Sequence, residues 1–326
     1  MKLMKLYRPA LFFVFLCVAS VITQAFAEEL EDGNLIERMR FWDSTHDFIS
    51  KKLHAPVEWF DDFFSDERVL EEVPARSILR LRSDLIFSEG GETFLRTFLH
   101  ASVRLPKMRK KLKIIISDEN EDPVPVSAGE IVKTGARQAR YGDRADVGLR
   151  YSVLDTMLSR LHFGGGMKAE TPLNPYARAY YRHLFPLTEV SQIRFSATAR
   201  RQRLDGWRKT LQLGVERLFA GSNILRWGNS VIFEDPDVDY HWESYIGFQQ
   251  QISERNALSY TLGMSGISDD RHIVENYRAS VRFRRNFYKG WVFYELEPAN
   301  DWPRDDFGEY SSVASFTFRL EVQFGY

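Results

Sequence analysis

The sequence predicts an all-β fold: a transmembrane antiparallel β-barrel of about fourteen strands, with twelve as the alternative, preceded by a short N-terminal helical segment. Three observations predict this fold. Apolar and polar residues alternate with a period of two from about residue 76 almost to the end. Arginine recurs on the polar face of one run after another, and turn residues separate the runs at nearly regular intervals.

Residues 1–27 have the parts of a secretory signal peptide. A basic start is followed by an apolar stretch, residues 11–22, and then by Ala25 and Ala27, small side chains that are typical of a cleavage site. The exported chain is therefore expected to begin near Glu28. No long apolar run follows, so no transmembrane helix is expected.

Cysteine occurs once, at Cys17 inside this predicted signal. Disulfide bonds, thiolate zinc sites and cysteine nucleophiles are therefore excluded from the exported protein. A lipid attached to Cys17 is the less favoured alternative, because Leu16 stands where a small residue is expected before such a cysteine.

Residues 28–75 form a separate acidic segment. Between Glu28 and Glu72 there are 14 acidic and 5 basic residues, whereas the remainder of the exported chain is net positive. Apolar residues recur at helical spacing, and Pro56 interrupts them. Two short amphipathic helices in the periplasm are expected here.

Residues 76–326 carry the barrel pattern. In residues 77–87, leucine and phenylalanine side chains share one face, while arginine and aspartate occupy the other. Comparable alternation occurs at residues 95–105, 147–153, 193–200, 208–216, 277–284 and 315–326, and weaker runs occur near residues 110–117, 157–165, 176–185, 223–233, 240–252, 256–266 and 290–297. Two long loops are expected, at residues 118–143 and 299–310.

The density of arginine on the polar face favours a membrane barrel over a soluble β-sandwich. If the polar face lines a lumen, the apolar faces meet lipid, every strand edge is paired and no backbone group is left unsatisfied in hydrocarbon. The predicted signal peptide and strands of about 9 to 12 residues fit this arrangement. The predicted location is the outer membrane of a Gram-negative bacterium, with both termini in the periplasm.

The last run resembles the closing strand of bacterial outer-membrane β-barrel proteins. Its alternating side chains end with Phe324 and Tyr326, where that class usually ends in Phe. The pieces at residues 291–298 and 318–321 are similar to those of uncharacterised proteobacterial barrels with an N-terminal helical segment. The resemblance implies that Phe324 and Tyr326 form the signal read by the barrel-assembly machinery, and it implies no catalytic motif.

Arginine residues are the candidate selectivity groups of the lumen. Guanidinium groups match carboxylate and phosphate oxygens, so a lumen with surplus arginine is expected to prefer anions. The alternative is that the arginines pair with acidic groups and water and simply fill the barrel. The candidates are Arg80, Arg82, Arg96, Arg104, Arg150, Arg178, Arg182, Arg194, Arg208, Arg278, Arg282 and Arg319.

Other chemistry is weakly indicated. His100 and Ser102 share a strand face and are the nearest approach to a hydrolase pair, but no third group is identifiable. Aromatic residues near strand ends, including Tyr176 and Tyr180, predict interfacial girdles, with carbohydrate stacking as the alternative. No cofactor, metal site or nucleic-acid partner is expected; the expected partners are outer-membrane lipid, the assembly machinery and small solutes.

Three functions follow from these features. The favoured one is a narrow passive pore or uptake channel for small solutes, which are expected to be anionic. The second is a closed barrel that serves as a structural anchor or assembly protein, with the acidic segment as a periplasmic docking arm. An outer-membrane hydrolase that uses His100 and Ser102 is the third.

Charge predicts how the two parts meet. A tethered segment of net negative charge is attracted to a lumen rich in arginine. We therefore expect residues 28–72 to occlude the periplasmic mouth, and we expect salt to loosen an exposed contact of this kind. The alternative is a helical pair lying on the membrane. The residues expected to form the plug or docking surface are Trp42, Trp59, Phe60, Phe63 and Phe64.

Overall fold

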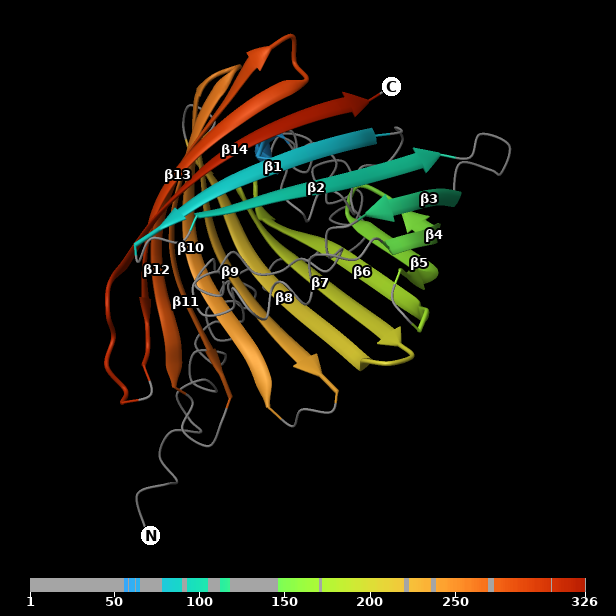
Figure 1. The fold of residues 1–326 in the computed structure, drawn as a ribbon. Coiled ribbons are helices and arrows are strands. Elements are labelled where there is room, and N and C mark those ends of the chain that lie inside the picture. Colours follow the sequence, from blue (N-terminus) through green and yellow to red (C-terminus); the bar gives the residue numbers. More distant parts are fainter. Residues whose placement is uncertain are drawn as a thin grey trace, which may run out of the picture. The chain divides into compact units, whose positions relative to one another are not determined.

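The computed structural model describes a closed antiparallel barrel of fourteen strands, as the sequence predicts (Figure 1). The described residues are 56–57, 59–61, 63–64, 78–89, 93–104, 112–117, 146–169, 172–219, 223–235, 239–268, 273–305 and 307–325. The predicted signal peptide, most of the acidic segment and the predicted loop 118–143 lie outside them.

Each strand pairs with its neighbours in sequence, and β1 pairs with β14 to close the barrel. In the closing seam Leu79 lies opposite Phe324, and Asp84 lies opposite Arg319. The strands are β1 (Ile78–Ser88), β2 (Thr93–Arg104), β3 (Leu112–Ser117), β4 (Asp146–Asp155), β5 (Ser159–Lys168), β6 (Asn174–Thr188), β7 (Ser191–Gln202), β8 (Gly206–Phe219), β9 (Asn223–Glu234), β10 (Tyr240–Ser253), β11 (Asn256–Ile267), β12 (Val274–Tyr288), β13 (Val292–Pro303) and β14 (Val313–Gly325).

The predicted loop at residues 299–310 is wrong in its first part. β13 continues to Pro303, and an isolated bridge joins Arg304 to Tyr310. Polar residues such as Asn300 and Asp301 are typical of loops, so the sequence alone favours a loop here. In this barrel they belong to a strand whose inward face is polar. Asp301 is fully buried.

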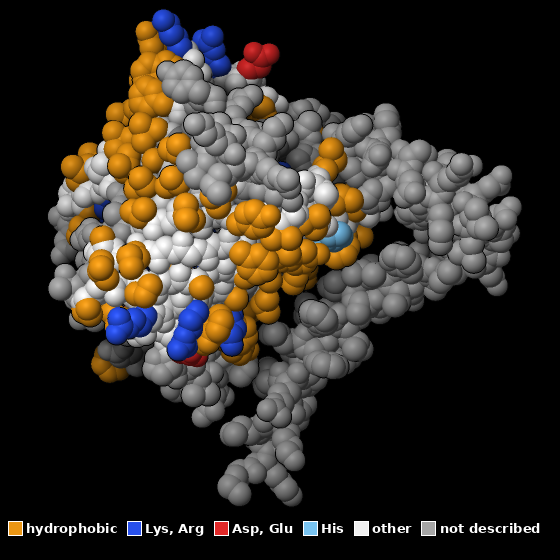
Figure 2. Space-filling model, turned by 90° about the vertical axis from the view of Figure 1, so that its right-hand side faces the viewer, with side chains coloured by type: hydrophobic (Ala, Val, Ile, Leu, Met, Phe, Trp, Pro, Cys, Tyr) orange, Lys and Arg blue, Asp and Glu red, His pale blue; other side chains and the backbone are white. Residues whose placement is uncertain are grey.

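The strand faces have the polarity of a membrane protein. Buried positions are mostly polar or charged, whereas large hydrophobic side chains are exposed on the outward faces, among them Leu95, Leu99, Ile246 and Leu262. Figure 2 shows hydrophobic side chains spread over one face of the outer wall, with Lys and Arg near the upper and lower edges of that face. A barrel in lipid has this arrangement, because its outer band must be apolar while its lumen is polar. The predicted transmembrane barrel is confirmed.

The lengths of the connections orient the barrel. Six connections lie at the end where β1 begins and β14 finishes, and all but residues 105–111 are two or three residues long: 105–111, 156–158, 189–190, 220–222, 254–255 and 289–291. The opposite end has the longer connections, including residues 118–145 and 304–312. Outer-membrane barrels have short periplasmic turns and longer extracellular loops, so the end that holds the start of β1 is the periplasmic end.

One short helical segment, within residues 56–64, lies at this periplasmic end (Figure 1). The backbone N–H of Phe64 donates to the carbonyl of Phe60 at 2.9 Å, which is one helical turn. Phe60, Phe63 and Phe64 are buried in a cluster with Ile224, Ala257 and Phe293, which begin or nearly begin β9, β11 and β13. Among the described residues no helix is long and apolar enough to cross a bilayer.

The outward position of Leu262 leads to a stability prediction. Leu262 lies midway along β11 and is 63% exposed. Replacement by Arg should lower the free energy of unfolding in lipid by about 2–4 kcal/mol, because a charge at mid-depth of the bilayer is costly. Urea titration of protein folded into phosphatidylcholine vesicles measures this loss. Leu262→Met is the control, and equal stabilities for the two variants would contradict an outer wall in lipid.

Candidate functional site

The interior of the barrel has two walls of different charge. The basic wall consists of β3 to β7, and the balanced wall consists of β12, β13, β14 and β1. The described part of the basic wall carries eight buried basic side chains and a single buried carboxylate, that of Asp146. The basic side chains are Lys113, Arg150, Arg160, Lys168, Arg178, Arg182, Arg194 and Arg200.

The basic wall owes its order to strand register. Lys113, Arg150, Gly164, Arg178, Arg200 and Arg208 occupy consecutive paired positions on β3 to β8. Residues paired across neighbouring strands point to the same side of a sheet, and strands are spaced about 4.8 Å apart. The register therefore forms a row of cationic side chains across the lumen wall, and only Gly164 interrupts it.

Two ion pairs hold the side chains of the row on β7 and β8. Arg200 donates from Nη2 to Asp146 Oδ2 at 2.7 Å, and its guanidinium lies 4.2 Å from the centre of the Tyr176 ring. On β8, Arg208 Nη1 lies 2.7 Å from Glu234 Oε1. These contacts hold Arg200 and Arg208, the last two arginines on the β8 side of the row, while Arg150 and Arg178 flank the gap at Gly164.

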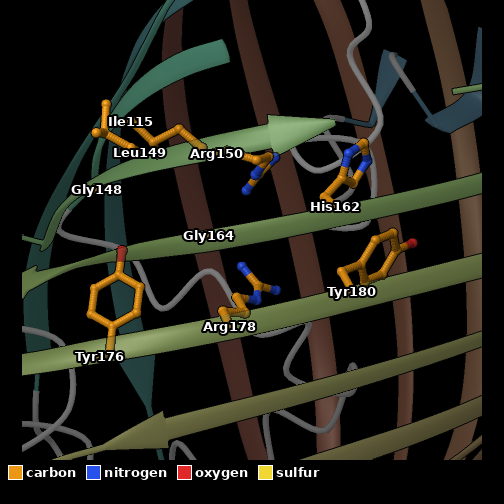
Figure 3. Close-up of a pocket in the computed structure, with 9 residues that line it drawn as sticks. All are labelled: Ile115, Gly148, Leu149, Arg150, His162, Gly164, Tyr176, Arg178 and Tyr180. Carbon is orange, nitrogen blue, oxygen red and sulfur yellow. The ribbon is translucent and has the colours of Figure 1, made fainter. Parts of the chain in front are cut away.

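A pocket opens at this gap. Figure 3 shows the guanidinium groups of Arg150 and Arg178 pointing toward one another on either side of Gly164. Tyr176 lines one end of the pocket, and His162 and Tyr180 line the other (Figure 3). The last two rings are stacked, with centroids 5.8 Å apart and planes 8° apart. The pocket thus joins two cationic groups to aromatic rings, a combination suited to small organic anions.

Glycine makes room for Tyr176 against the wall. A Cβ on Gly148 would lie 2.5 Å from the Tyr176 hydroxyl oxygen, and one on Gly166 would lie 2.8 Å from it. Both distances are too short for ordinary contact. The two glycines therefore let the Tyr176 ring lie on the backbone of β4 and β5, where it stacks with Arg200.

The balanced wall is a network of ion pairs. Arg278 contacts Asp301 at 2.7 Å and Glu297 at 3.0 Å, and Arg282 contacts Glu297 at 3.0 Å. Further contacts join Arg284 to Glu321 at 2.9 Å and Arg319 to Asp84 at 2.8 Å, and both arginines also contact Glu295. On this side the guanidinium charges are neutralised by carboxylates of the wall itself.

A third cluster lies at the periplasmic end. Asp61 of the helical segment accepts from Arg194 Nη2 at 2.9 Å and contacts Arg226 Nη2. Glu216 of β8 lies 3.2 Å from Arg194 Nε and 3.4 Å from Arg226 Nε. Asp61 is 3% exposed, so its carboxylate is buried between two lumen arginines.

The candidate lumen arginines occupy inward faces. Arg80, Arg150, Arg178, Arg182, Arg194 and Arg278 are buried, and Arg82, Arg96, Arg208, Arg282 and Arg319 are partly buried. The side chain of Arg104 lies outside the described residues. The structure places Arg150, Arg178, Arg182 and Arg194 on the basic wall and Arg80, Arg82, Arg278, Arg282 and Arg319 on the balanced wall, while Arg96 lies on β2 and Arg208 on β8. The sequence pattern did not predict this division.

The other candidate residues divide as follows. Phe60, Phe63 and Phe64 are buried and Trp59 is partly buried, while Trp42 and Tyr326 lie outside the described residues. Phe324 is exposed on the outer wall and stacks on Trp291, with ring centroids 5.4 Å apart. The girdle assignment is wrong for Tyr176 and Tyr180, which are buried on the inward face of β6. Tyr180 and Tyr181 are adjacent, so only one of them can face lipid.

The sequence pattern did not predict two contacts between a histidine and a serine on neighbouring strands. His162 Nδ1 lies 3.1 Å from the Ser152 hydroxyl inside the barrel, and His183 Nδ1 lies 2.6 Å from the Ser159 hydroxyl on the outward side. His100 and Ser102 are both buried on β2, two residues apart. The described residues include no group of His, Cys, Asp and Glu that could hold a metal ion.

Comparison with known proteins shows only that the fold of this chain resembles that of other barrels. No protein-family model and no curated protein matches the chain. The chain resembles the solved structure of a loop-deletion mutant of OmpT, an outer membrane protein of Vibrio cholerae (11% identity, 76% of this chain, 98% of that chain, TM-score 0.45). It also resembles the CymD monoaromatic hydrocarbon channel (7% identity, 82% of this chain, 92% of that chain, TM-score 0.47). A third similar structure is an anion-selective porin from Comamonas acidovorans (8% identity, 76% of this chain, 98% of that chain, TM-score 0.44). At such values nothing about the solute follows.

The fit of Tyr176 against glycine can be tested by a double substitution. Gly148→Ala should lower the free energy of unfolding by about 1–3 kcal/mol, because the new methyl group meets the Tyr176 hydroxyl. Tyr176→Phe removes that oxygen and leaves the nearest ring carbon at 3.4 Å, so the double variant should recover most of the loss. Denaturant titration of both single variants and the double variant gives the coupling. Simple additivity of the two losses would show that the predicted clash is absent.

Proposed function

Because the chain is a β-barrel of the bacterial outer membrane, we propose that it is a narrow passive pore for small solutes, with a preference for anions. The observation that carries the proposal is the unequal charge of the two lumen walls. The balanced wall neutralises its arginines with five buried carboxylates, whereas the described basic wall has one. Among the described residues, the lumen therefore has more buried basic groups than buried carboxylates along one side.

Fixed charge of one sign on a narrow polar passage selects ions. It attracts counter-ions, repels ions of its own sign, and acts more strongly where low-dielectric walls confine the field. Guanidinium groups also bind carboxylate and phosphate oxygens directly, through paired N–H donors. The row from Lys113 to Arg208, which runs from strand to strand around the wall, would then offer several cationic contacts to an anion that passes it.

Fourteen strands support a narrow pore. Barrels of about eight strands are filled by side chains, while those of 16 to 18 strands leave an aqueous channel. Large inward arginine side chains on both walls reduce the width further. Small solutes are therefore favoured over large ones.

We also propose that the acidic segment acts as a plug rather than as a docking arm or a surface helix. Phe60 is 0% exposed and packs with wall residues of the same chain, and Asp61 contacts Arg194 and Arg226. A docking arm or a helix on the membrane would instead present these aromatic rings outward. Because the Asp61 contact is buried, salt should screen it only weakly, so the salt response expected of an exposed contact becomes small.

The roles of the lipid and of the assembly machinery belong to the same proposal. The outer apolar wall is suited to outer-membrane lipid, and Phe324 near the end of β14 faces outward. That position suits an aromatic residue that an assembly protein reads before the barrel closes. A hydrolase based on His100 and Ser102 stays the less favoured alternative, because what unites these two residues is a shared inward face of β2.

The selectivity proposal is tested by charge removal on the basic wall. In planar bilayers under a salt gradient, Arg150→Gln and Arg178→Gln should each lower the anion-to-cation permeability ratio, and the double variant should lower it further. Arg217→Gln is the matched control, because it removes one charge from an exposed side chain on the outward face of β8. An equal effect of Arg217→Gln, or no effect of the double variant, would contradict selection by the basic wall.

Deletion of residues 28–72 tests the plug. The barrel ladder closes between β1 and β14 without this segment, so the shortened chain retains every strand pair. Its conductance should exceed that of the full chain, because the lumen loses an internal obstruction. A photo-crosslinking residue at position 60 should join the full chain to its own barrel wall. Crosslinks to another protein, with unchanged conductance after deletion, would favour the docking arm.

A further inference from the structure

The contact between the helical segment and the lumen has the chemistry of a ligand in its site. Each carboxylate oxygen of Asp61 meets a different arginine: Oδ2 meets Arg194 and Oδ1 meets Arg226. Two guanidinium groups that converge on one carboxylate are a common means of binding organic acids. Here the carboxylate comes from the chain itself.

The wall supports this site without the helical segment. Glu216 lies within 3.4 Å of both arginines, and Gln192 donates to Glu216 at 2.6 Å. These contacts orient Arg194 and Arg226 from their neighbouring strands. With Asp61 removed, Glu216 would still hold both guanidinium groups in place.

An apolar patch of the wall, here called the apolar seat and formed by Ile224, Ala257 and Phe293, adjoins the site. Phe60, Phe63 and Phe64 pack against Ile224, Ala257 and Phe293 of the wall, which is unusual in a lumen lined mostly by polar groups. The Phe63 and Phe293 rings meet edge to face, with centroids 6.0 Å apart. The wall therefore accepts an aromatic group and a carboxylate next to one another.

We propose that Arg194 and Arg226, with the apolar seat beside them, form a binding site for small aromatic carboxylates, and that residues 56–64 occupy it as an internal competitor. An aromatic acid entering the barrel displaces Asp61 and its neighbouring phenylalanines, and the helical segment is released. The inference rests on the proposed pore function, and it adds the class of solute and the cause of opening.

The ligand class follows from what the segment itself supplies. A free carboxylate without a ring can replace only the Asp61 contact, and a neutral ring can replace only the phenylalanine contacts. Phenylacetate supplies both. We therefore expect phenylacetate to release the segment at lower concentration than acetate, and benzyl alcohol to be the weakest of the three.

Conductance of the full chain tests the proposal. Phenylacetate should raise the conductance of the wild type by roughly fivefold or more, the range of ordinary coupling between ligands. Asp61→Asn should conduct without phenylacetate and respond little to it, because its amide loses the charged contact. Asp61→Glu is the matched control and should keep the wild-type response.

A crosslinking measurement reads the same event without current. A photo-crosslinking residue in place of Trp59, which packs against the buried cluster, leaves Phe293 and both arginines of the proposed site unchanged. It should join the helical segment to the barrel wall. Phenylacetate should lower the yield, and acetate at the same concentration should lower it less.

The outcomes separate the two proposals. If phenylacetate lowers crosslinking while neither the wild type nor Asp61→Asn conducts, the site stands and the pore fails. If Asp61→Asn conducts but phenylacetate changes neither crosslinking nor wild-type conductance, the pore stands and the aromatic carboxylate site is overturned. Equal effects of phenylacetate and benzyl alcohol would also overturn it, because the arginines would then have no part in recognition.

Discussion

The buried guanidinium group is the constraint on which the rest of this structure depends. A lumen must be polar, but an arginine held away from water needs charged or hydrogen-bonding partners, since removing one partner of a buried pair costs several kcal/mol. This barrel meets the need differently around its circumference. One wall supplies its own carboxylates, and one cluster takes a carboxylate from the N-terminal segment.

That difference connects electrostatics to function. The network around Arg278, Arg284 and Arg319 holds β12, β13, β14 and β1 together with charges that largely cancel. In the described part of the other wall, which carries the row from Lys113 to Arg200, buried basic side chains outnumber buried carboxylates. The proposed ion preference is thus assigned to a different wall from the ion-pair network, and the helical segment meets β7 and β9 through Arg194 and Arg226.

The sequence predicted most of the architecture for a simple physical reason. The side chains of a strand alternate strictly, so polar and apolar faces in a barrel are readable one residue at a time. All fourteen strands followed from this period, and so did the inward position of the candidate arginines that the structure describes. The pairing of partners did not follow, because Asp61 and Arg194 are 133 residues apart. Asp301 was placed in a loop for a related reason: a polar strand end and a polar loop have the same composition.

The positions of Tyr176, Gly148 and Gly166 show a second limit of the sequence. Their close fit depends on the register of β4, β5 and β6, which the alternation of a single strand does not determine. Register also creates the gap at Gly164 between two arginines. A glycine run in one strand gives no indication of which side chains flank it on the next strands.

The most direct test of the account is the reversal potential of the purified full chain in a planar bilayer, measured under a chloride salt gradient with Asp61→Asn beside the wild type. The account predicts that Asp61→Asn passes more current than the wild type, and that its reversal potential has the sign of an anion-preferring pore. A reversal potential of the opposite sign, or no current from either protein, would contradict the claim that the unbalanced arginine wall governs passage through this barrel.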